Sequence, residues 1–382
     1  MKLMRYKNHC LAALLVALLA LSFIYGLMLG ARRLPPYPWL ETCYRQYVLR
    51  QYDRYDKFHS FYKETDVRSL ISIEDESDVT EKRDELVRYV WKDDGFPYAR
   101  LPDGVEEGVE DDKYSALANL ERIDKIVVSM EHGIDSVVYH FRPARSNRRL
   151  VIYHEGHGGD FVLGKGAIQF FLDEGYSVMA FSMPLMGMNS RPKVDFPSFG
   201  RLLLSMHNYL RFLESENFSP IKFFVEPVAA VLNYAEKNLD FRSVAVVGIS
   251  GGGWTATLYA ALDPRVSKSY PVAGSLPLYM SHVTCTGEYE QFLPDLYRAA
   301  NYLELYVLGS YGEGRRQLQV LNKYDNVCLA GDGYLTYEKE VQRTVAQLGK
   351  GRFDVYLDDS HKGHKISRHA LDVILDDLES RL

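Results

Sequence analysis

A serine stands within a run of small residues in the stretch "VAVVGISGGGWTATLYAALDP", which begins at residue 244. Gly248 precedes Ser250 by two positions, and three glycines follow it at positions 251–253. Glycine permits sharp turns and close approach of neighbouring elements, but it costs conformational entropy, so four glycines around one serine indicate a turn with a specific purpose. The valines before the turn predict a buried strand, and residues 255–262 predict a helix that stops before a proline.

This strand, turn and helix give the pattern Gly248-Ile249-Ser250-Gly251-Gly252 a chemical meaning. A GxSxG sequence in that context is typical of a nucleophile elbow, in which a strained turn lifts the serine Oγ clear of the sheet. The alternative is a glycine-rich turn that binds phosphate at a helix N-terminus, but neither GxGxxG nor GxxxxGK[ST] is present. We therefore expect Ser250 to be a nucleophile and the Gly251 N–H to stabilise an oxyanion.

From about residue 124 onward, predicted strands alternate with predicted helices, which indicates a doubly wound, mostly parallel sheet. The first two strands are joined by a short glycine-containing turn and predict an antiparallel hairpin. The expected strands span residues 125–130, 135–143, 149–156, 176–184, 243–250, 268–275, 317–325 and 353–359. Helical patterns lie near residues 165–174, 222–237, 251–262, 334–348 and 368–381.

With the elbow on the fifth of these strands, the chain from about Asp124 to its end resembles an α/β-hydrolase, a superfamily of mostly serine esterases, lipases and peptidases. The resemblance implies the α/β-hydrolase fold, here an eight-stranded, mostly parallel sheet flanked by helices. It also implies a triad in the order nucleophile, acid, histidine. In such a triad the histidine accepts the serine proton and the carboxylate orients the histidine.

Candidates for the acid and the base occur in that order. Asp325 ends the seventh strand, at the edge where open α/β sheets gather functional groups, and Asp332 is the nearest alternative acid. Asp325 also fits a plain turn aspartate. His361 and His364 both lie in the loop after the last strand. We prefer His364 as the base because the chain leads directly from it to Ser367, a candidate N-cap, and we keep His361 as the alternative.

The stretch "YHEGHGGD" at residues 153–160 resembles the HGGG-type loop of the family. The resemblance implies that the His157 N–H is the second oxyanion donor. Glu155 stands where the family often has histidine, which leaves the anchoring of the loop open. A metal site formed by His154, His157 and Asp160 is the competing interpretation, but the spacing is not HExxH and no further ligand cluster is evident. We therefore expect no metal and no cofactor.

Two long insertions, residues 183–221 and 276–316, follow the fourth and sixth strands. In this fold such loops cover the catalytic end of the sheet and set substrate choice. Both are rich in Met, Tyr, Leu and Phe. These side chains fit either an acyl-accepting groove or packing against the sheet.

The N-terminus has a different character. Residues 10–31 carry no charge and are numerous enough to cross a membrane as a helix. We favour an uncleaved single-pass anchor over a cleaved signal peptide, because the run exceeds a usual h-region and Leu29-Gly30-Ala31 is a poor cleavage site. Basic residues on both sides leave the orientation open, although a long domain after an anchor can be translocated out of the cytoplasm regardless of charge.

These features predict three parts: a transmembrane anchor at 1–33, a linker and helical appendage at 34–123, and a catalytic α/β-hydrolase domain at 124–382. Within the appendage, a tyrosine-rich stretch at 44–62 predicts a helix that packs on the main domain or lies on the membrane surface. A second helix is expected over 79–92, with Asp78 in capping-box spacing.

Composition limits the function classes. The 382 residues are 47% hydrophobic, ordinary for a globular protein. The net charge of -6 without a long basic run gives no reason to expect a nucleic-acid partner. Outside the anchor, the three cysteines allow at most one intramolecular pair. The resemblance implies a serine hydrolase acting on carboxylic esters, and the uncharged run at 10–31 predicts that it is anchored in a membrane. An acyltransferase or peptidase with the same triad, or a catalytically silent membrane-tethered binding module, remain alternatives.

Overall fold

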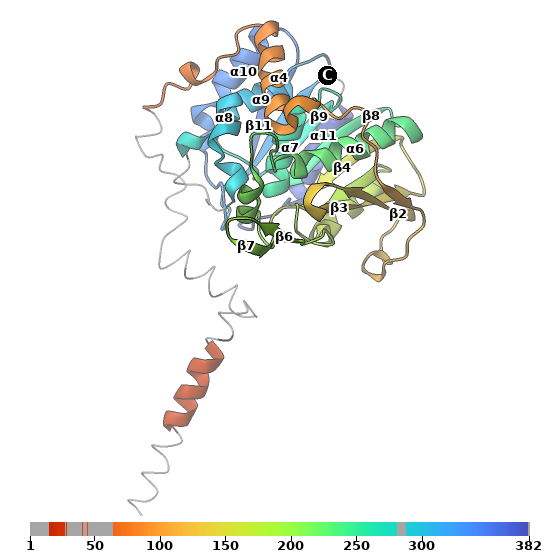
Figure 1. The fold of residues 1–382 in the computed structure, drawn as a ribbon, viewed down its shortest axis with the longest axis vertical. Coiled ribbons are helices and arrows are strands. Elements are labelled where there is room, and N and C mark those ends of the chain that lie inside the picture. The colour runs from red at the N-terminus through yellow and green to blue at the C-terminus, as the bar shows by residue number, and fades with distance from the viewer. Residues whose placement is uncertain are drawn as a thin grey trace, which may run out of the picture. The chain divides into compact units, whose positions relative to one another are not determined.

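The computed structural model describes residues 15–26, 28, 40, 44, 64–280 and 288–380, and it forms two compact units, residues 1–57 and 58–382. In the first unit residues 15–26 are helical (red in Figure 1), and apolar side chains such as Leu19 and Phe23 are exposed. None of the helices in the described ranges is both long and apolar enough to cross a membrane. The rest of the predicted anchor, and the tyrosine-rich stretch apart from Tyr44, lie outside the described residues.

A nine-stranded sheet organises the second unit, in the order β1-β2-β3-β5-β4-β8-β9-β10-β11. All eight predicted strands are present, but the predicted count of eight was wrong because a short edge strand joins them. Its three residues are all exposed, so the sequence there carries no hydrophobic alternation to reveal it. The strands span β1 (Gly104–Glu106), β2 (Leu120–Ser129), β3 (Asp135–Pro143), β4 (Arg149–His154), β5 (Ser177–Phe181), β8 (Ser243–Ile249), β9 (Lys268–Val272), β10 (Arg316–Asn322) and β11 (Arg352–Asp358).

The pairing agrees with a mostly parallel sheet. Strands β2 and β3 form the predicted antiparallel hairpin, and β3 pairs antiparallel with β5. From β5 across to β11 all neighbours are parallel. The carboxyl ends of β8, β10 and β11 therefore lie at one edge of the sheet, which is where Ser250, Asp325 and His364 follow in the chain.

Helices cover both faces of the sheet (Figure 1), and each face has its own hydrophobic cluster. Along β4 the side chains alternate: Leu150 and Ile152 join one cluster, while Val151 and Tyr153 join the other. The cluster with Leu150 includes residues of α4, α6, α7, α9 and α10, and the other includes residues of α5 and α11. The helices span α4 (Glu76–Trp91), α5 (Lys165–Asp173), α6 (Lys222–Asn238), α7 (Gly251–Leu262), α9 (Tyr302–Ser310), α10 (Glu338–Gln347) and α11 (Arg368–Glu379).

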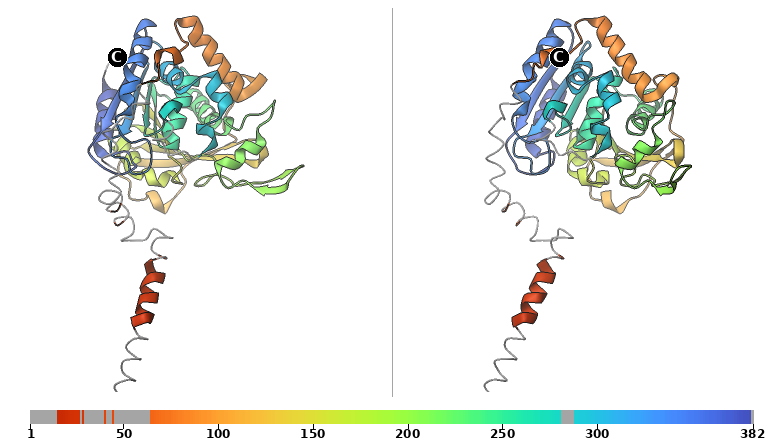
Figure 2. Two further views of the ribbon diagram at one scale, coloured as in Figure 1. Left: turned by 90° about the vertical axis from the view of Figure 1, so that its left-hand side faces the viewer. Right: turned by 60° about the vertical axis from the view of Figure 1, so that its left-hand side comes forward.

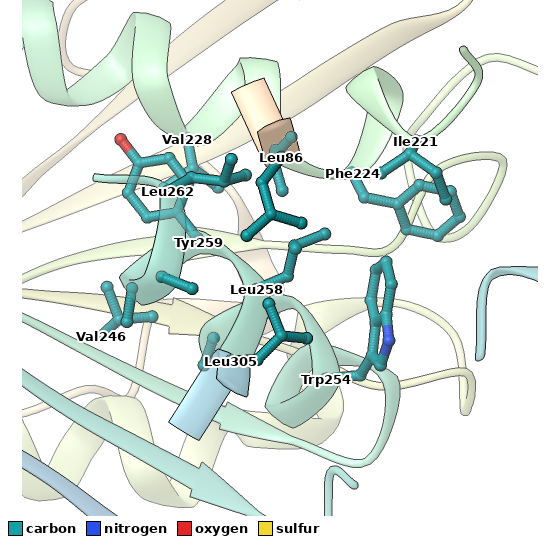
Figure 3. Packing of buried hydrophobic residues seen from close by; sticks show 14 of the residues in the cluster. Leu86, Ile221, Phe224, Val228, Val246, Trp254, Leu258, Tyr259, Leu262 and Leu305 are labelled. Atoms are coloured by element: carbon teal, nitrogen blue, oxygen red, sulfur yellow. The ribbon is translucent and has the colours of Figure 1, made fainter. Parts of the chain in front are cut away.

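Helix α4 belongs to the predicted appendage but lies in the same compact unit as the sheet. Its cap differs from the expected one: Asp75 is the N-cap, and Asp78 completes the capping box at the third helical position. Leu86, on its inner face, is fully buried in the cluster drawn in Figure 3, which also holds Leu258 of α7. The described residues 64–123 thus belong to the same compact unit as the sheet.

The two insertions fold differently. The first forms a two-stranded antiparallel hairpin, β6 (Lys193–Phe196) with β7 (Gly200–Leu203), which projects from the rest of the unit in the left view of Figure 2. The second contributes α8 (Pro294–Ala299) and α9. All residues of α9 are buried, so this part of the second insertion belongs to the core.

Helix α7 starts at the elbow and is buried on every side. Its small residues let α6, α9 and the sheet approach closely. Trp254 lies in the first turn of the helix, and its Nε1–H donates to Tyr297 Oη at 2.8 Å. Figure 3 shows Leu258 and Tyr259 among side chains from α4, α6, β8 and α9. Each large apolar side chain buried in this way stabilises the fold by about 1.5–3 kcal/mol. The elbow is thus attached to a rigid core.

Candidate active site

Ser250 sits at the turn between β8 and α7, as the sequence predicts. Its backbone has φ 56° and ψ −123°, a positive φ that a non-glycine residue adopts at a cost of about 1–3 kcal/mol. Two backbone hydrogen bonds hold this conformation. Ser250 N–H donates to Val272 O at 2.9 Å, and Ser250 O accepts from Trp254 N–H at 2.9 Å. The strained turn of a nucleophile elbow is therefore present.

The glycines around Ser250 are explained by close backbone contacts. A Cβ on Gly248 would lie 2.1 Å from Gly252 O, and one on Gly252 would lie 2.1 Å from His154 O. Across the turn, a Cβ on Gly156 would lie 2.6 Å from the Cβ of Ser250. No side chain fits at such distances. The elbow packs directly against the loop that follows β4 because these positions carry only hydrogen.

Asp325 and His364 are in direct contact: His364 Nδ1 lies 2.7 Å from Asp325 Oδ2. The carboxylate is only 1% exposed, and its Oδ1 accepts from the backbone N–H groups of Val327 at 2.8 Å and Cys328 at 3.0 Å. Burial opposes the charge, but the hydrogen bond and charge attraction of His364 outweigh it, so the pKa of Asp325 is lowered. An ionised carboxylate thus fixes the orientation of the His364 ring.

The other ring nitrogen of His364 is left available. Its Nε2 is buried and has no hydrogen-bond partner within the part of the chain that the structure describes. His364 and Ser250 line the same two cavities. The Nε2 atom is therefore the one that can accept a proton from a hydroxyl in these cavities.

His361, the alternative base, lies beside a different carboxylate. His361 Nε2 lies 3.3 Å from Asp358 Oδ2, and its Nδ1 accepts from Gly363 N–H at 3.1 Å. Asp358 is fully buried and also accepts from the hydroxyls of Ser360 and Ser367, so it ties this loop to the start of α11. His361 Nε2 makes no hydrogen bond among the described residues either, so the two candidate bases differ in their carboxylate: His364 is hydrogen-bonded to Asp325, whereas His361 only lies near Asp358.

Glu155 anchors the loop after β4. Its Oε2 accepts from the Tyr153 hydroxyl at 2.7 Å and its Oε1 from Gly156 N–H at 2.9 Å, while its own N–H donates to Phe181 O at 2.9 Å. Burial raises the pKa of this carboxyl group. Glu155 therefore holds this loop in place through both of its carboxyl oxygens.

This anchoring brings the His157 ring against the first residue of α7. A Cβ on Gly251 would lie 2.4 Å from His157 Cε1, so the two predicted oxyanion donors belong to adjoining segments. The alternative metal set is not assembled: His154 Nδ1 bonds to the Glu155 carbonyl, and Asp160 caps a turn by accepting from Val162 N–H. Within the described ranges, His157 instead clusters with two residues from the insertions, His207 and Glu290.

Two cavities meet at Ser250, Gly158 and His364. The first, of about 490 Å³, has mostly apolar walls that include Leu276, Phe292 and Val327. The second, of about 610 Å³, is bordered by loop residues after β4 and by side chains near α11, including Lys365 and Arg368. Described residues of the second insertion line the first cavity, whereas those of the first insertion do not.

The sequence analysis did not identify His207 and Glu290 as neighbours of the site, and it did not place Cys328 in the wall of a cavity. His207 and Glu290 are 83 positions apart, in two insertions without any recognisable motif, so no local signal could have joined them. Cys328 lies in the wall of the first cavity and is disulfide-bonded, within the predicted limit of one pair. Its proximity to Asp325 was visible in the sequence, but its pairing was not.

No protein-family model and no curated protein sequence matches this chain. Solved structures do. Acetyl xylan esterase 1 from Thermoanaerobacterium sp. JW/SL YS485 is 14% identical with a TM-score of 0.55, and the match covers 85% of this chain and 100% of that one. The acetyl xylan esterase from Paenibacillus sp. R4 is also 14% identical, with a TM-score of 0.52 and coverage of 83% and 98%. A methylesterase is 16% identical, with a TM-score of 0.54 and coverage of 81% and 65%. At such identities the likeness concerns the fold, and this chain therefore shares the α/β-hydrolase fold of these esterases.

Proposed function

We propose that this protein is a serine hydrolase that cleaves carboxylic esters, with Ser250 as nucleophile, His364 as base and Asp325 as the orienting acid. One observation carries the proposal. His364 is held by Asp325 through Nδ1, and its unpaired Nε2 belongs to a ring that shares both cavities with the strained Ser250. The fold of the solved esterases supports the same assignment.

In the first half of the reaction, Ser250 Oγ attacks the ester carbonyl carbon and His364 Nε2 takes the hydroxyl proton. Asp325 stabilises the imidazolium that forms. The backbone N–H groups of Gly251 and His157 stabilise the negative oxygen. The intermediate then expels the alcohol, which takes the proton from His364, and leaves an acyl-serine. Water repeats the sequence and releases the carboxylic acid.

The two cavities suggest how an ester is held. Apolar walls such as Leu276 and Phe292 suit the hydrocarbon part of a substrate in the first cavity. The second cavity is also lined mostly by apolar atoms, but Glu155, Lys365 and Arg368 add charged groups to it, so it suits a part of the substrate that carries polar groups. Since both meet at Ser250, an ester bond between an apolar and a polar group fits across the serine.

Labelling with a fluorophosphonate probe tests the proposal, because the probe reacts with activated serines whatever the substrate. We expect the full chain to be labelled and to hydrolyse p-nitrophenyl acetate. The Ser250→Ala variant should lose both properties while keeping its far-UV circular dichroism. Ser275→Ala is the matched control, since Ser275 lines the same cavity but is bonded to the Tyr306 hydroxyl at 3.0 Å. A folded wild-type protein that resists the probe would overturn the mechanism.

We also propose, on the sequence alone, that residues 10–31 anchor the chain in a membrane as a single span, with orientation left open. The support is the uncharged length of this run. The expected result is retention of the protein in the membrane fraction after washes with high salt and alkaline carbonate, and release when residues 1–33 are deleted. Recovery of a soluble chain that starts near Arg32 would show a cleaved signal instead.

A further inference from the structure

Beside the candidate active site, three side chains from three distant segments converge. His157 lies in the loop after β4, His207 begins the 3-10 turn η8 (His207–Leu213), and Glu290 lies in the 3-10 turn η10 (Tyr289–Gln291). Glu290 Oε1 is 2.8 Å from His157 Nε2 and 3.3 Å from His207 Nδ1. One nitrogen or oxygen of each residue lies within 4.8 Å of the others. The two insertions thus meet the loop at one buried point.

The hydrogen bonding of His207 fixes which nitrogen faces the cluster. Its Nε2 lies 2.8 Å from Pro184 O, a carbonyl that can only accept, so Nε2 carries the hydrogen. Facing the Glu290 carboxylate at 3.3 Å, Nδ1 also carries a hydrogen when no metal is bound. Metal binding would release that proton and leave the Nδ1 lone pair directed at the ion. A histidine that binds a metal through one nitrogen usually donates from the other to a carbonyl or carboxylate in this way. The surroundings of His207 therefore fit a metal ligand.

Glu290 supplies a second, independent observation. Its side chain is fully buried, and Oε1 receives both imidazole contacts. Its Oε2 is buried and has no hydrogen-bond partner among the described residues. A buried carboxylate oxygen without a partner is costly, because it has lost the water that solvated it. A bound cation would satisfy this oxygen and both rings together.

We propose that His157 Nε2, His207 Nδ1 and the Glu290 carboxylate bind one divalent transition-metal ion, for which zinc is the best fit. Two imidazole nitrogens and one carboxylate suit zinc, whereas calcium and magnesium prefer sites made only of oxygen ligands. Such an ion would tie both insertions to the loop that carries His157. It would thereby position the His157 segment beside Gly251 without taking part in the serine chemistry.

Metal content of the purified full chain tests the site directly. The protein is produced without a histidine tag in zinc-supplemented medium, and bound metal is measured by mass spectrometry after removal of loosely held ions. We expect about one zinc per chain, as for a single three-residue site. His207→Gln and Glu290→Gln should each weaken zinc binding by about 100-fold or more, because each removes a direct ligand and the loss of an outer-shell partner alone costs about 10–100-fold. His369→Gln is the matched control, because His369 is exposed on α11 and remote from the cluster in sequence; it should keep its zinc.

A second measurement needs no variant and guards against misfolding. Cobalt added to the metal-free wild-type protein should produce visible absorption bands of a low-coordinate site with nitrogen ligands, and zinc should abolish them. A folded wild-type protein that takes up neither ion would overturn the proposal and leave a hydrogen-bonded imidazole–carboxylate–imidazole cluster. Zinc retained in both cluster variants would overturn it too, by placing the metal elsewhere. Probe labelling of Ser250 is recorded separately, so failure of the metal site is distinguishable from failure of the serine mechanism.

Discussion

Two carboxylate–imidazole pairs lie near Ser250. Their contact distances are similar, but they differ in which ring nitrogen remains without a partner. Asp325 meets His364 at 2.7 Å, and Glu290 meets His157 at 2.8 Å. In the first pair the carboxylate takes Nδ1, so Nε2 remains unpaired beside the serine cavities. In the second pair the carboxylate takes Nε2 and a second imidazole follows behind it.

The difference teaches that a histidine's function depends on which nitrogen its partner occupies. A base must offer a lone pair to the reacting hydroxyl, and of these two pairs only that of His364 leaves a ring nitrogen without a hydrogen-bond partner among the described residues. His157 Nε2 instead faces the Glu290 carboxylate, so it is not available to accept a proton from a substrate or from Ser250. Sequence neighbours carry no such information, because both histidines stand in glycine-containing loops at the carboxyl ends of strands.

The largest effect is expected from the test of whether His364 is the catalytic base. We expect His364→Ala to lower kcat by about 10⁴-fold or more, because Ser250 then lacks its proton acceptor. His361→Ala should cost less than about tenfold, since its ring is paired with Asp358. Ester hydrolysis by the two purified variants gives the ranking. The reverse order would move the base to His361, and two mild effects would remove the triad.

Asp325→Asn tests whether the carboxylate of the first pair sets the tautomer of the ring. We expect a loss of about 10⁴-fold in kcat with an intact fold, because an amide no longer stabilises the imidazolium and favours the wrong tautomer. Asp332→Asn is the matched control, being the alternative acid in the same loop. The assignment would fail if Asp332→Asn proved the more damaging change in a kcat measurement.

Glu290→Gln should have an intermediate effect. The amide keeps the size of the side chain but loses its charge, so the His157 loop is held less firmly while the triad stays intact. We expect kcat/KM to fall by about tenfold, comparable to the loss of an outer-shell partner. Steady-state kinetics of Glu290→Gln and Asp325→Asn, measured side by side, compare the two losses in kcat/KM. A loss equal to that of Asp325→Asn would mean that the second pair also takes part in the chemistry.

His140 offers a contrast to both pairs, because it is a buried histidine without a hydrogen bond to a carboxylate. It lies 3.9 Å from Asp124, and burial lowers its pKa to about 3. As pH falls below about 6.5, the unfolded chain binds a proton that the folded ring does not, so stability is lost progressively toward pH 3. His140→Phe should remove roughly 2 kcal/mol of the loss between pH 7 and pH 5.

Urea unfolding of His140→Phe and wild type at both pH values measures this difference. The exposed His369→Phe is the control and should keep the wild-type pH dependence. Ester hydrolysis at pH 7 should be unaffected, because His140 lies on β3 and lines neither of the two cavities that meet at Ser250. An unchanged pH slope in His140→Phe would show that the ring is not held neutral by burial.

Much of the fold could be predicted because each signal is local. Valine-rich strands, alanine-rich helices and the glycine turn around Ser250 follow from side-chain periodicity and backbone sterics within short windows. The edge strand β1 escaped prediction because its three exposed residues have no buried face to mark them. The exact cap of α4 also differed, since Asp75 and Asp78 share one capping box and either fits the pattern.

The sequence by itself determined the elbow, the order of candidate residues and the parallel sheet, because these depend on neighbours within a few positions. Only the tertiary structure decided that His364 rather than His361 contacts Asp325, since both histidines share one loop and differ only in how it folds. Only the tertiary structure assembled His157 with Glu290 as well. Their partners come from insertions whose path is set by packing against the whole core, and long-range packing leaves no periodic mark in the sequence.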